Sequence, residues 1–418
     1  MLTVADNQKN LLKDGNPFFY LADTCWSAFT NISDQEWDYY LAKRKAQGFN
    51  TVQINILPQW DASGTDLDWK PFVDGDPMKL NDAYFEHARA MAQKAKDQGF
   101  ELALVVLWCN YVPGTWASKM FPTDVVPQEF IKPYVQKVDA TFSDLDPIYV
   151  ISGDTDFPEP LTEAYYIEAA DELTKLHPDG LYTTHIKGRY SYIPKELEKH
   201  LNLHFYQSGH NAKDLSMPYS LSETMQEKYE PKPLINSEPC YEEMGYSGGQ
   251  YGRWTRRDVR RAAWVSVLSG ASAGVTYGAA GIYSWHQAGK DFMAKLGEGF
   301  DLPKAWPEAM NFDGAWDYGY LKRIMDGRTI TPRQDLLANK TTEIRIAQDD
   351  ENQDLLIYVP HNTKVRLNGG FSNYTFEAID LADRFTSVLP AKVKEKMTIL
   401  DMHPFHEDAL IIARPNKA

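Results

Sequence analysis

The chain has 418 residues, which is more than one average domain requires. Its net charge of −15 and isoelectric point of about 5.2 exclude the extensive basic surface that binding to nucleic acid or an anionic membrane requires. Hydrophobic residues make up 43% of the chain, yet no apolar run reaches the roughly 20 residues of a membrane span. We therefore expect a globular protein without a nucleic-acid or membrane partner.

Three cysteines, Cys25, Cys109 and Cys240, form neither a CxxC pair nor a zinc-ligand pattern. The N-terminal segment lacks the basic leader and apolar stretch of a signal peptide. These observations predict free thiols in a reducing cytoplasm. A leader removed before the first residue would instead mean a secreted or periplasmic protein.

Apolar, strand-like runs alternate with amphipathic helical segments through the first two thirds of the chain. The strands are predicted at residues 17–24, 51–57, 101–108, 148–153, 181–186, 201–206, 233–237 and within 270–285. The first helix opens with a capping box, with Ser33 at the cap and Glu36 three residues later. Eight such runs, most followed by a helix, predict a parallel (β/α)8 barrel over residues 1–330. An open doubly wound sheet is the alternative, but no glycine-rich nucleotide motif follows the first run.

After about residue 343 the pattern changes to short strands without long helices. The runs are 343–348, 354–360, 364–368, 374–383 and 409–415. They predict a small antiparallel β-sandwich domain over residues 343–418. A connector containing one helix near 314–326 joins the two domains.

Two acids follow predicted barrel strands: Asp154 comes after the fourth run and Glu238 after the seventh. The active sites of such barrels lie at the carboxyl ends of the strands, where strands four and seven face each other. Glycoside hydrolysis needs one carboxyl group to protonate the leaving oxygen and another to attack the anomeric carbon or activate water. We interpret Asp154 and Glu238 as this pair. For either acid alone, a structural ion pair is the alternative.

Further polar and aromatic residues at the strand ends are candidates for substrate binding, because rings stack on sugar faces while amides and imidazoles bind hydroxyls. These residues are Asp23, Trp26, Asn55, Gln59, Trp60, Trp108, Asn110, His185, His204, Tyr206, Tyr277 and Trp285. Packing is the alternative for the tryptophans, and a tie to the next helix is the alternative for Asp23. His185 and His204 can equally be buried against backbone carbonyls.

Three other acids lie near the predicted pair. Asp156 is two residues beyond the fourth strand, a position that better fits a loop contact or a sugar hydroxyl. Glu242 and Glu243 follow the seventh strand, and we expect them in solvent beyond the barrel rim.

Four segments, KDGNPFFYLADTCW, ISGDTD, INSEP and RAAWVSVLSGASAGVTYG, resemble the apiosidase-like glycoside hydrolases. These are clan A barrels with a small C-terminal β domain that is often labelled collagen-binding. The resemblance covers nearly the whole chain and implies that Asp154 is the general acid/base and Glu238 the nucleophile. Most clan A relatives carry an Asn-Glu pair after the fourth strand, whereas this chain has Gly153-Asp154, which fits the subgroup.

The resulting hypothesis is a retaining, exo-acting glycosidase that removes a terminal sugar from a short oligosaccharide or glycoside. The resemblance nominates apiose or a related pentose or hexose. A non-catalytic carbohydrate-binding barrel is an alternative. A metal-dependent hydrolase barrel is weaker, because the first strand lacks an HxH pair. We expect a carbohydrate partner and neither a metal nor a cofactor, while the sequence indicates no oligomeric state.

Overall fold

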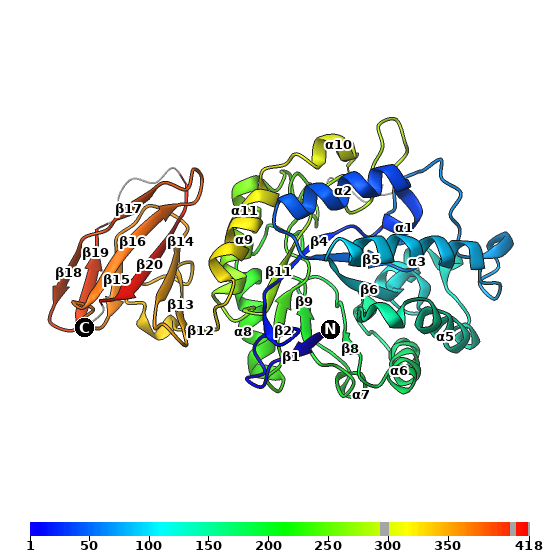
Figure 1. The fold of residues 1–418 in the computed structure, drawn as a ribbon, viewed down its shortest axis with the longest axis horizontal. Coiled ribbons are helices and arrows are strands. Elements are labelled where there is room, and N and C mark those ends of the chain that lie inside the picture. The colour runs from blue at the N-terminus through cyan, green and yellow to red at the C-terminus, as the bar shows by residue number, and fades with distance from the viewer. Residues whose placement is uncertain (293–300, 402–406, 417–418) are drawn as a thin grey trace.

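The computed structural model describes residues 1–292, 301–401 and 407–416. Its central sheet contains eight parallel strands in the order β8-β7-β6-β5-β4-β11-β10-β9. These strands are β4 (Tyr20–Thr24), β5 (Thr51–Asn55), β6 (Glu101–Trp108), β7 (Ile148–Gly153), β8 (Leu181–Thr183), β9 (His204–Tyr206), β10 (Leu234–Asn236) and β11 (Gly274–Tyr277). Helices surround the sheet (Figure 1), so the predicted (β/α)8 barrel is confirmed.

The barrel strands are buried almost throughout, as in β6, where all eight residues are buried. Burial on both faces explains why these runs are nearly continuously apolar. The predicted capping box is present at α2. The Ser33 side chain accepts from the Glu36 backbone N–H, and the Glu36 side chain accepts from the Ser33 backbone N–H. The helices are α1 (Ala28–Asn31), α2 (Asp34–Ala46), α3 (Asp82–Asp97), α4 (Trp116–Met120), α5 (Ile131–Phe142), α6 (Pro160–Leu176), α7 (Lys195–Glu198), α8 (Met217–Lys228), α9 (Arg256–Val267), α10 (Trp306–Ala309) and α11 (Gly314–Met325). None of the helices in the described part of the chain is long and apolar enough to cross a membrane.

The first predicted run is two strands rather than one. Residues 16–18 form β3, which pairs with β2 (Leu11–Lys13), and β2 pairs in turn with β1 (Leu2–Val4). The barrel begins only at Tyr20. The sequence did not predict this small antiparallel sheet, whose strands have three residues each and too little alternation to stand out.

The C-terminal part contains two antiparallel sheets, which confirms the predicted sandwich. One has the order β12-β13-β14-β20-β16-β17 and the other β15-β19-β18. Their strands are β12 (Ile330–Pro332), β13 (Arg345–Asp349), β14 (Leu355–Val359), β15 (Val365–Asn368), β16 (Tyr374–Asp380), β17 (Thr386–Val388), β18 (Ala391–Lys394), β19 (Met397–Leu400) and β20 (Ala409–Pro415). The domain limits 1–330 and 343–418 stay a prediction. Within the second range, residues 402–406 and 417–418 lie outside the described residues.

The sandwich lies beside α9 and α11 (Figure 1). A buried ionic cluster joins it there to the barrel domain. Arg260 of α9 is 2% exposed and lies 2.9 Å from Asp317 of α11 and 2.5 Å from Asp408 beside β20. Arg256 donates to Asp317 at 2.7 Å, and the Tyr358 hydroxyl donates to Asp408 at 2.8 Å. Each buried charge therefore has an opposite charge or a hydrogen-bond donor, which is the condition for burying it.

Candidate active site

A small cavity of about 60 Å³ lies at the carboxyl ends of the barrel strands. It is lined by Trp26, Trp60, Asp61, Trp108, Trp116, Asp154, Gln207, His210, Glu238, Tyr241, Met244 and Tyr283. Of the residues proposed from the sequence, it brings together Trp26, Trp60, Trp108, Asp154 and Glu238. The cavity thus combines carboxyl groups with a wall that consists largely of aromatic rings.

Glu238 follows β10 by two residues and is 6% exposed. Its Oε1 accepts a hydrogen bond from Nε2 of Gln207 at 2.9 Å and lies 2.7 Å from Nε2 of His210. Its Oε2 lies 3.2 Å from Nε2 of His185. Burial alone would raise the pKa of Glu238, but His185 and His210 outweigh it and lower that pKa to about 2. Glu238 is therefore ionised at any physiological pH.

His185 connects the two proposed catalytic residues. Its Nδ1 accepts a hydrogen bond from the backbone N–H of Asp154 at 3.1 Å. A neutral imidazole that accepts at Nδ1 carries its proton on Nε2, the atom that faces Glu238. His185 is fully buried and packs against the rings of Trp26 and Trp108, which also contact each other. It therefore orients Glu238 from behind the cavity wall.

Asp154 follows β7 directly and has a backbone φ of +50°, a conformation that is strained for a residue with a side chain. The indole of Trp116 donates to its carbonyl at 2.7 Å and helps to hold this turn. Burial raises the pKa of Asp154 well above its usual range, and the negative charges of Glu238 and Asp61 raise it further. Lys187 offsets part of this effect. The Asp154 carboxyl thus favours its protonated form beside an ionised Glu238.

Gly153 explains the departure from the Asn-Glu pair. A Cβ at this position would come 2.1 Å from the Trp108 ring, a distance that no real side chain tolerates. The indole of Trp108 therefore occupies the space that a residue-153 side chain would need. Gly153 and Trp108 are a matched pair at the edge of the cavity.

Asp23 and Tyr277 face out of the barrel, away from the cavity. Tyr20 and Thr276 point inward, where both contact Oε1 of Gln53. Because successive strand residues alternate between faces, Asp23 and Tyr277 point outward. Asp23 accepts from Tyr40 at 2.7 Å and from Arg44 at 2.6 Å, both on α2. These hydrogen bonds connect the first barrel strand to the next helix, which was the alternative for Asp23. The Tyr277 hydroxyl donates to Glu242.

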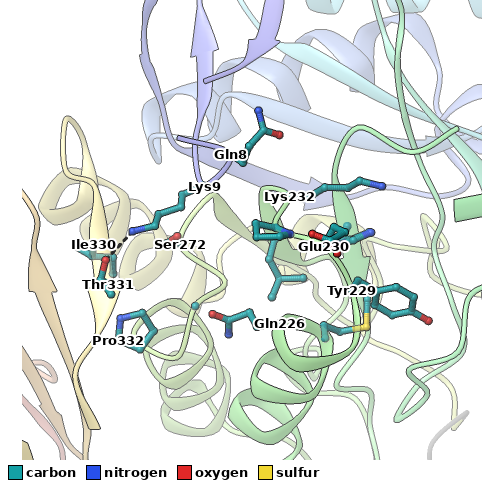
Figure 2. A pocket seen from close by; sticks show the side chains of 15 residues that line it. Gln8, Lys9, Gln226, Tyr229, Glu230, Lys232, Ser272, Ile330, Thr331 and Pro332 are labelled. Carbon is teal, nitrogen blue, oxygen red and sulfur yellow. Dashed lines mark hydrogen bonds between the residues drawn. The ribbon is translucent and has the colours of Figure 1, made fainter. Parts of the chain in front are cut away.

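His204 was expected at the carboxyl end of the sixth strand, but this placement is wrong because His204 begins β9. Its imidazole lies 3.3 Å from Glu198 at the opposite end of the barrel. There it lines a different cavity of about 270 Å³ between α8, β12 and the turn that carries Lys9 (Figure 2). Tyr206 is also turned outward, and its hydroxyl donates to the Pro218 carbonyl.

The other candidates are buried close to the rim without lining the cavity. Asn55 donates to Gln59, which donates in turn to Ser27, and Asn110 donates to Asp124. These amides hold loops below the site. Trp285 stacks on Trp306 with ring centroids 4.8 Å apart, outside the barrel. Their positions favour scaffolding over direct contact with a sugar.

The family model described as "Apiosidase-like, catalytic domain" matches residues 5–331. This chain belongs to the apiosidase-like family. The resemblance found in the sequence is therefore confirmed, and the protein is a glycoside hydrolase that acts on carbohydrate. No curated protein matches the sequence.

Solved structures similar to this apiosidase-like protein agree in fold. A chain described as "Glycoside hydrolase" is 20% identical, with a TM-score of 0.83 over 99% of this chain and 96% of its own. A glycoside hydrolase family 5 structure from Bacteroides vulgatus is 21% identical, with a TM-score of 0.82 over 99% and 93%. An endo-1,4-beta-mannanase from Rhizomucor miehei is 13% identical, with a TM-score of 0.52 over 78% and 99%. At these identities the likeness concerns the fold.

The three rival acids of this apiosidase-like chain have other partners. Asp156 does not line the described cavity and pairs with Lys187 at 3.2 Å. Glu242 is buried rather than solvated, since it accepts from Tyr277 at 2.6 Å and from the Gly314 backbone at 2.9 Å. Burial raises the pKa of Glu242 to about 7. Glu243 is on the surface, although not fully exposed.

Seven lining residues of the cavity were not proposed from the sequence. Two had a usable signal: Gln207 directly follows the sixth predicted run, and Asp61 directly follows Trp60. The others lie in loops, where no periodicity marks the side that faces the barrel mouth. These are Trp116, His210, Tyr241, Met244 and Tyr283. No group of three or more His, Cys, Asp or Glu side chains within the described ranges is arranged to hold a metal ion.

Proposed function

We propose that this apiosidase-like protein is a retaining glycosidase, with Glu238 as nucleophile and Asp154 as general acid/base. One observation carries the proposal: two carboxyl groups line one cavity, and their pKa values are driven in opposite directions. A pair of this kind divides the two roles, because the ionised member attacks while the protonated member donates.

In the proposed first step, a Glu238 oxygen attacks the anomeric carbon and the bond to the leaving oxygen breaks. Asp154 gives its proton to that oxygen, so the product leaves as a neutral alcohol. In the second step, Asp154 takes a proton from water while the water oxygen attacks the anomeric carbon and releases Glu238. The Gln207 and His210 donors keep Glu238 oriented through both steps.

The aromatic wall of the cavity supports exo action on a terminal sugar. Trp26, Trp60, Trp108 and Trp116 contribute much of this wall. A small site walled by rings suits one sugar unit, stacked on a ring, better than an extended chain. Family membership nominates apiosides or related pentosides as the first compounds to examine.

Proton NMR of the hydrolysis reaction tests the mechanism. We expect one of the 4-nitrophenyl apiosides, arabinosides, xylosides, galactosides or glucosides to be hydrolysed. The first sugar observed should have the anomeric configuration of the substrate, because two displacements restore it. Initial appearance of the opposite anomer would mean a single displacement by water and would remove the nucleophilic role of Glu238.

A further inference from the structure

A third carboxyl group, that of Asp61, lines the same cavity as Asp154 and Glu238. Asp61 lies in the loop between β5 and α3, directly after the wall residue Trp60, and is only 8% exposed. Nothing in the two displacement steps uses it. A buried acid with no role in the chemistry requires another explanation, because burying a carboxyl group is costly.

The loop that carries Asp61 is anchored firmly. The hydroxyl of Ser63 lies 3.1 Å from the Ser284 hydroxyl and 3.1 Å from Nδ1 of His286, both in the loop after β11. Asn31 donates to the Ser63 carbonyl at 2.8 Å. These contacts fix the backbone two residues from Asp61. Its carboxyl is thus held in place before any ligand arrives, as a recognition site requires.

The described lining residues of the cavity include neither lysine nor arginine, and the imidazole of His210 among them contacts Glu238. Burial raises the pKa of Asp61 to about 7, and the charge of Glu238 adds to this effect. Its own backbone N–H and the Tyr283 hydroxyl stabilise the ionised form. An ionised carboxylate can accept about four hydrogen bonds. Acceptor positions therefore remain for a ligand in the cavity.

We propose that Asp61 binds two neighbouring hydroxyl groups of the terminal sugar held beside Glu238. Two hydroxyls on adjacent carbons, on the same side of the ring, match the two oxygens of one carboxylate. The substrate class is then glycosides whose terminal sugar carries a free vicinal diol on the edge facing Asp61. Tyr283 orients the carboxyl for this contact. The assignment to a terminal sugar rests on the proposed glycosidase function.

The test compares Asp61→Ala with Asp156→Ala, a matched loss of a nearby carboxyl that does not line the described cavity. The substrates are an aryl glycoside that the wild type hydrolyses and its monodeoxy analogues. We expect Asp61→Ala to lower kcat/KM for the parent glycoside roughly 10- to 100-fold, since hydrogen bonds to a charged group are worth this much. For an analogue lacking one of the two contacted hydroxyls, the loss in kcat/KM caused by Asp61→Ala should be roughly threefold or more smaller than on the parent, because only one contact remains to be removed. Asp156→Ala should change kcat/KM by the same factor on the parent and on the analogues.

An equal loss of kcat/KM on the parent and on every deoxy analogue would overturn the proposal. A purely structural effect of Asp61→Ala would not depend on which hydroxyl the substrate carries. A parent kcat/KM within threefold of wild type would also overturn the proposal. Binding of the corresponding free sugars to Glu238→Gln, with and without Asp61→Ala, supplies a second measurement that needs no turnover. If the wild type hydrolyses no glycoside but Asp61→Ala still weakens sugar binding, the glycosidase proposal fails and the diol contact stands. If sugars bind equally with and without Asp61, the diol contact fails.

Discussion

The buried carboxylates of the cavity and those of the sandwich interface are stabilised in two different ways. In the cavity, Glu238 accepts from the Gln207 amide and contacts the imidazoles of His185 and His210. At the sandwich interface, Asp317 and Asp408 face the guanidinium of Arg260. These contacts orient Glu238 and keep it ionised beside the cavity, where it can attack an electrophile. A guanidinium cancels the charge and fixes the geometry, so the carboxylate serves stability.

The largest expected effect is at Glu238. In Glu238→Gln an amide replaces the nucleophile and cannot form a glycosyl ester, so kcat should fall roughly 10⁴-fold or more. The melting temperature should stay within about two degrees of wild type, because the substituted group has similar size and still bonds to Gln207 and His210. Steady-state kinetics and calorimetry measure both. Activity within tenfold of wild type would remove Glu238 from this role.

Asp154→Ala should lower kcat on glycosides with poor leaving groups by roughly 10²- to 10⁴-fold. Dinitrophenyl glycosides should be glycosylated almost normally, because their leaving group departs without a proton. The glycosyl-enzyme then accumulates, and azide should restore turnover by forming a glycosyl azide of retained configuration. Asp156→Ala is the control and should show neither leaving-group dependence nor rescue. The reverse pattern would assign the acid/base role to Asp156.

At the interface, Arg260→Ala should lower the free energy of unfolding by about 3–5 kcal/mol, since it removes the guanidinium from buried Asp408 and one of the guanidinium groups around buried Asp317. The kcat/KM of the folded enzyme at low temperature should remain within threefold of wild type. Arg257→Ala is the matched control on the same helix, because Arg257 reaches only the rim at Pro360 and His361. Equal destabilisation by both variants, measured by denaturant unfolding, would contradict the role given to the buried cluster.

The smallest effect concerns pH. Asp154 must be protonated to act, so kcat/KM should fall as pH rises through its raised pKa. Lys187 lowers that pKa, so Lys187→Ala should move the alkaline limb of the profile to higher pH. The change in kcat/KM below this limb should be less than tenfold. Lys213→Ala, a lysine that does not act on Asp154, should leave the limb in place. A shift to lower pH would contradict the charge argument.

The barrel, the sandwich and the strand ends at Asp154 and Glu238 could be predicted, because each depends on a local run of apolar residues. Which way a side chain faces could not. Asp23, Tyr206 and Tyr277 lie at or near strand ends but point out of the barrel. Which face of a strand points inward depends on contacts between residues far apart in the chain, such as those of Tyr20 and Thr276 with Gln53. The ion pair between Arg260 and Asp408 joins residues 148 positions apart, so no local sequence pattern predicts it.

The close fit of Gly153 against Trp108 has a consequence for how this active site changes over evolutionary time. A chain that moves from Gly-Asp toward the Asn-Glu pair gains a side chain where the indole ring now lies. Either replacement alone destabilises the protein. A side chain at position 153 would clash with the Trp108 ring, and a smaller residue at position 108 would leave a cavity. We therefore expect positions 108 and 153 to covary among related sequences, with glycine accompanying tryptophan. Asp154, the proposed acid, would then be inherited together with the indole, and introducing a glutamate at position 154 would require exchanging positions 108, 153 and 154 together.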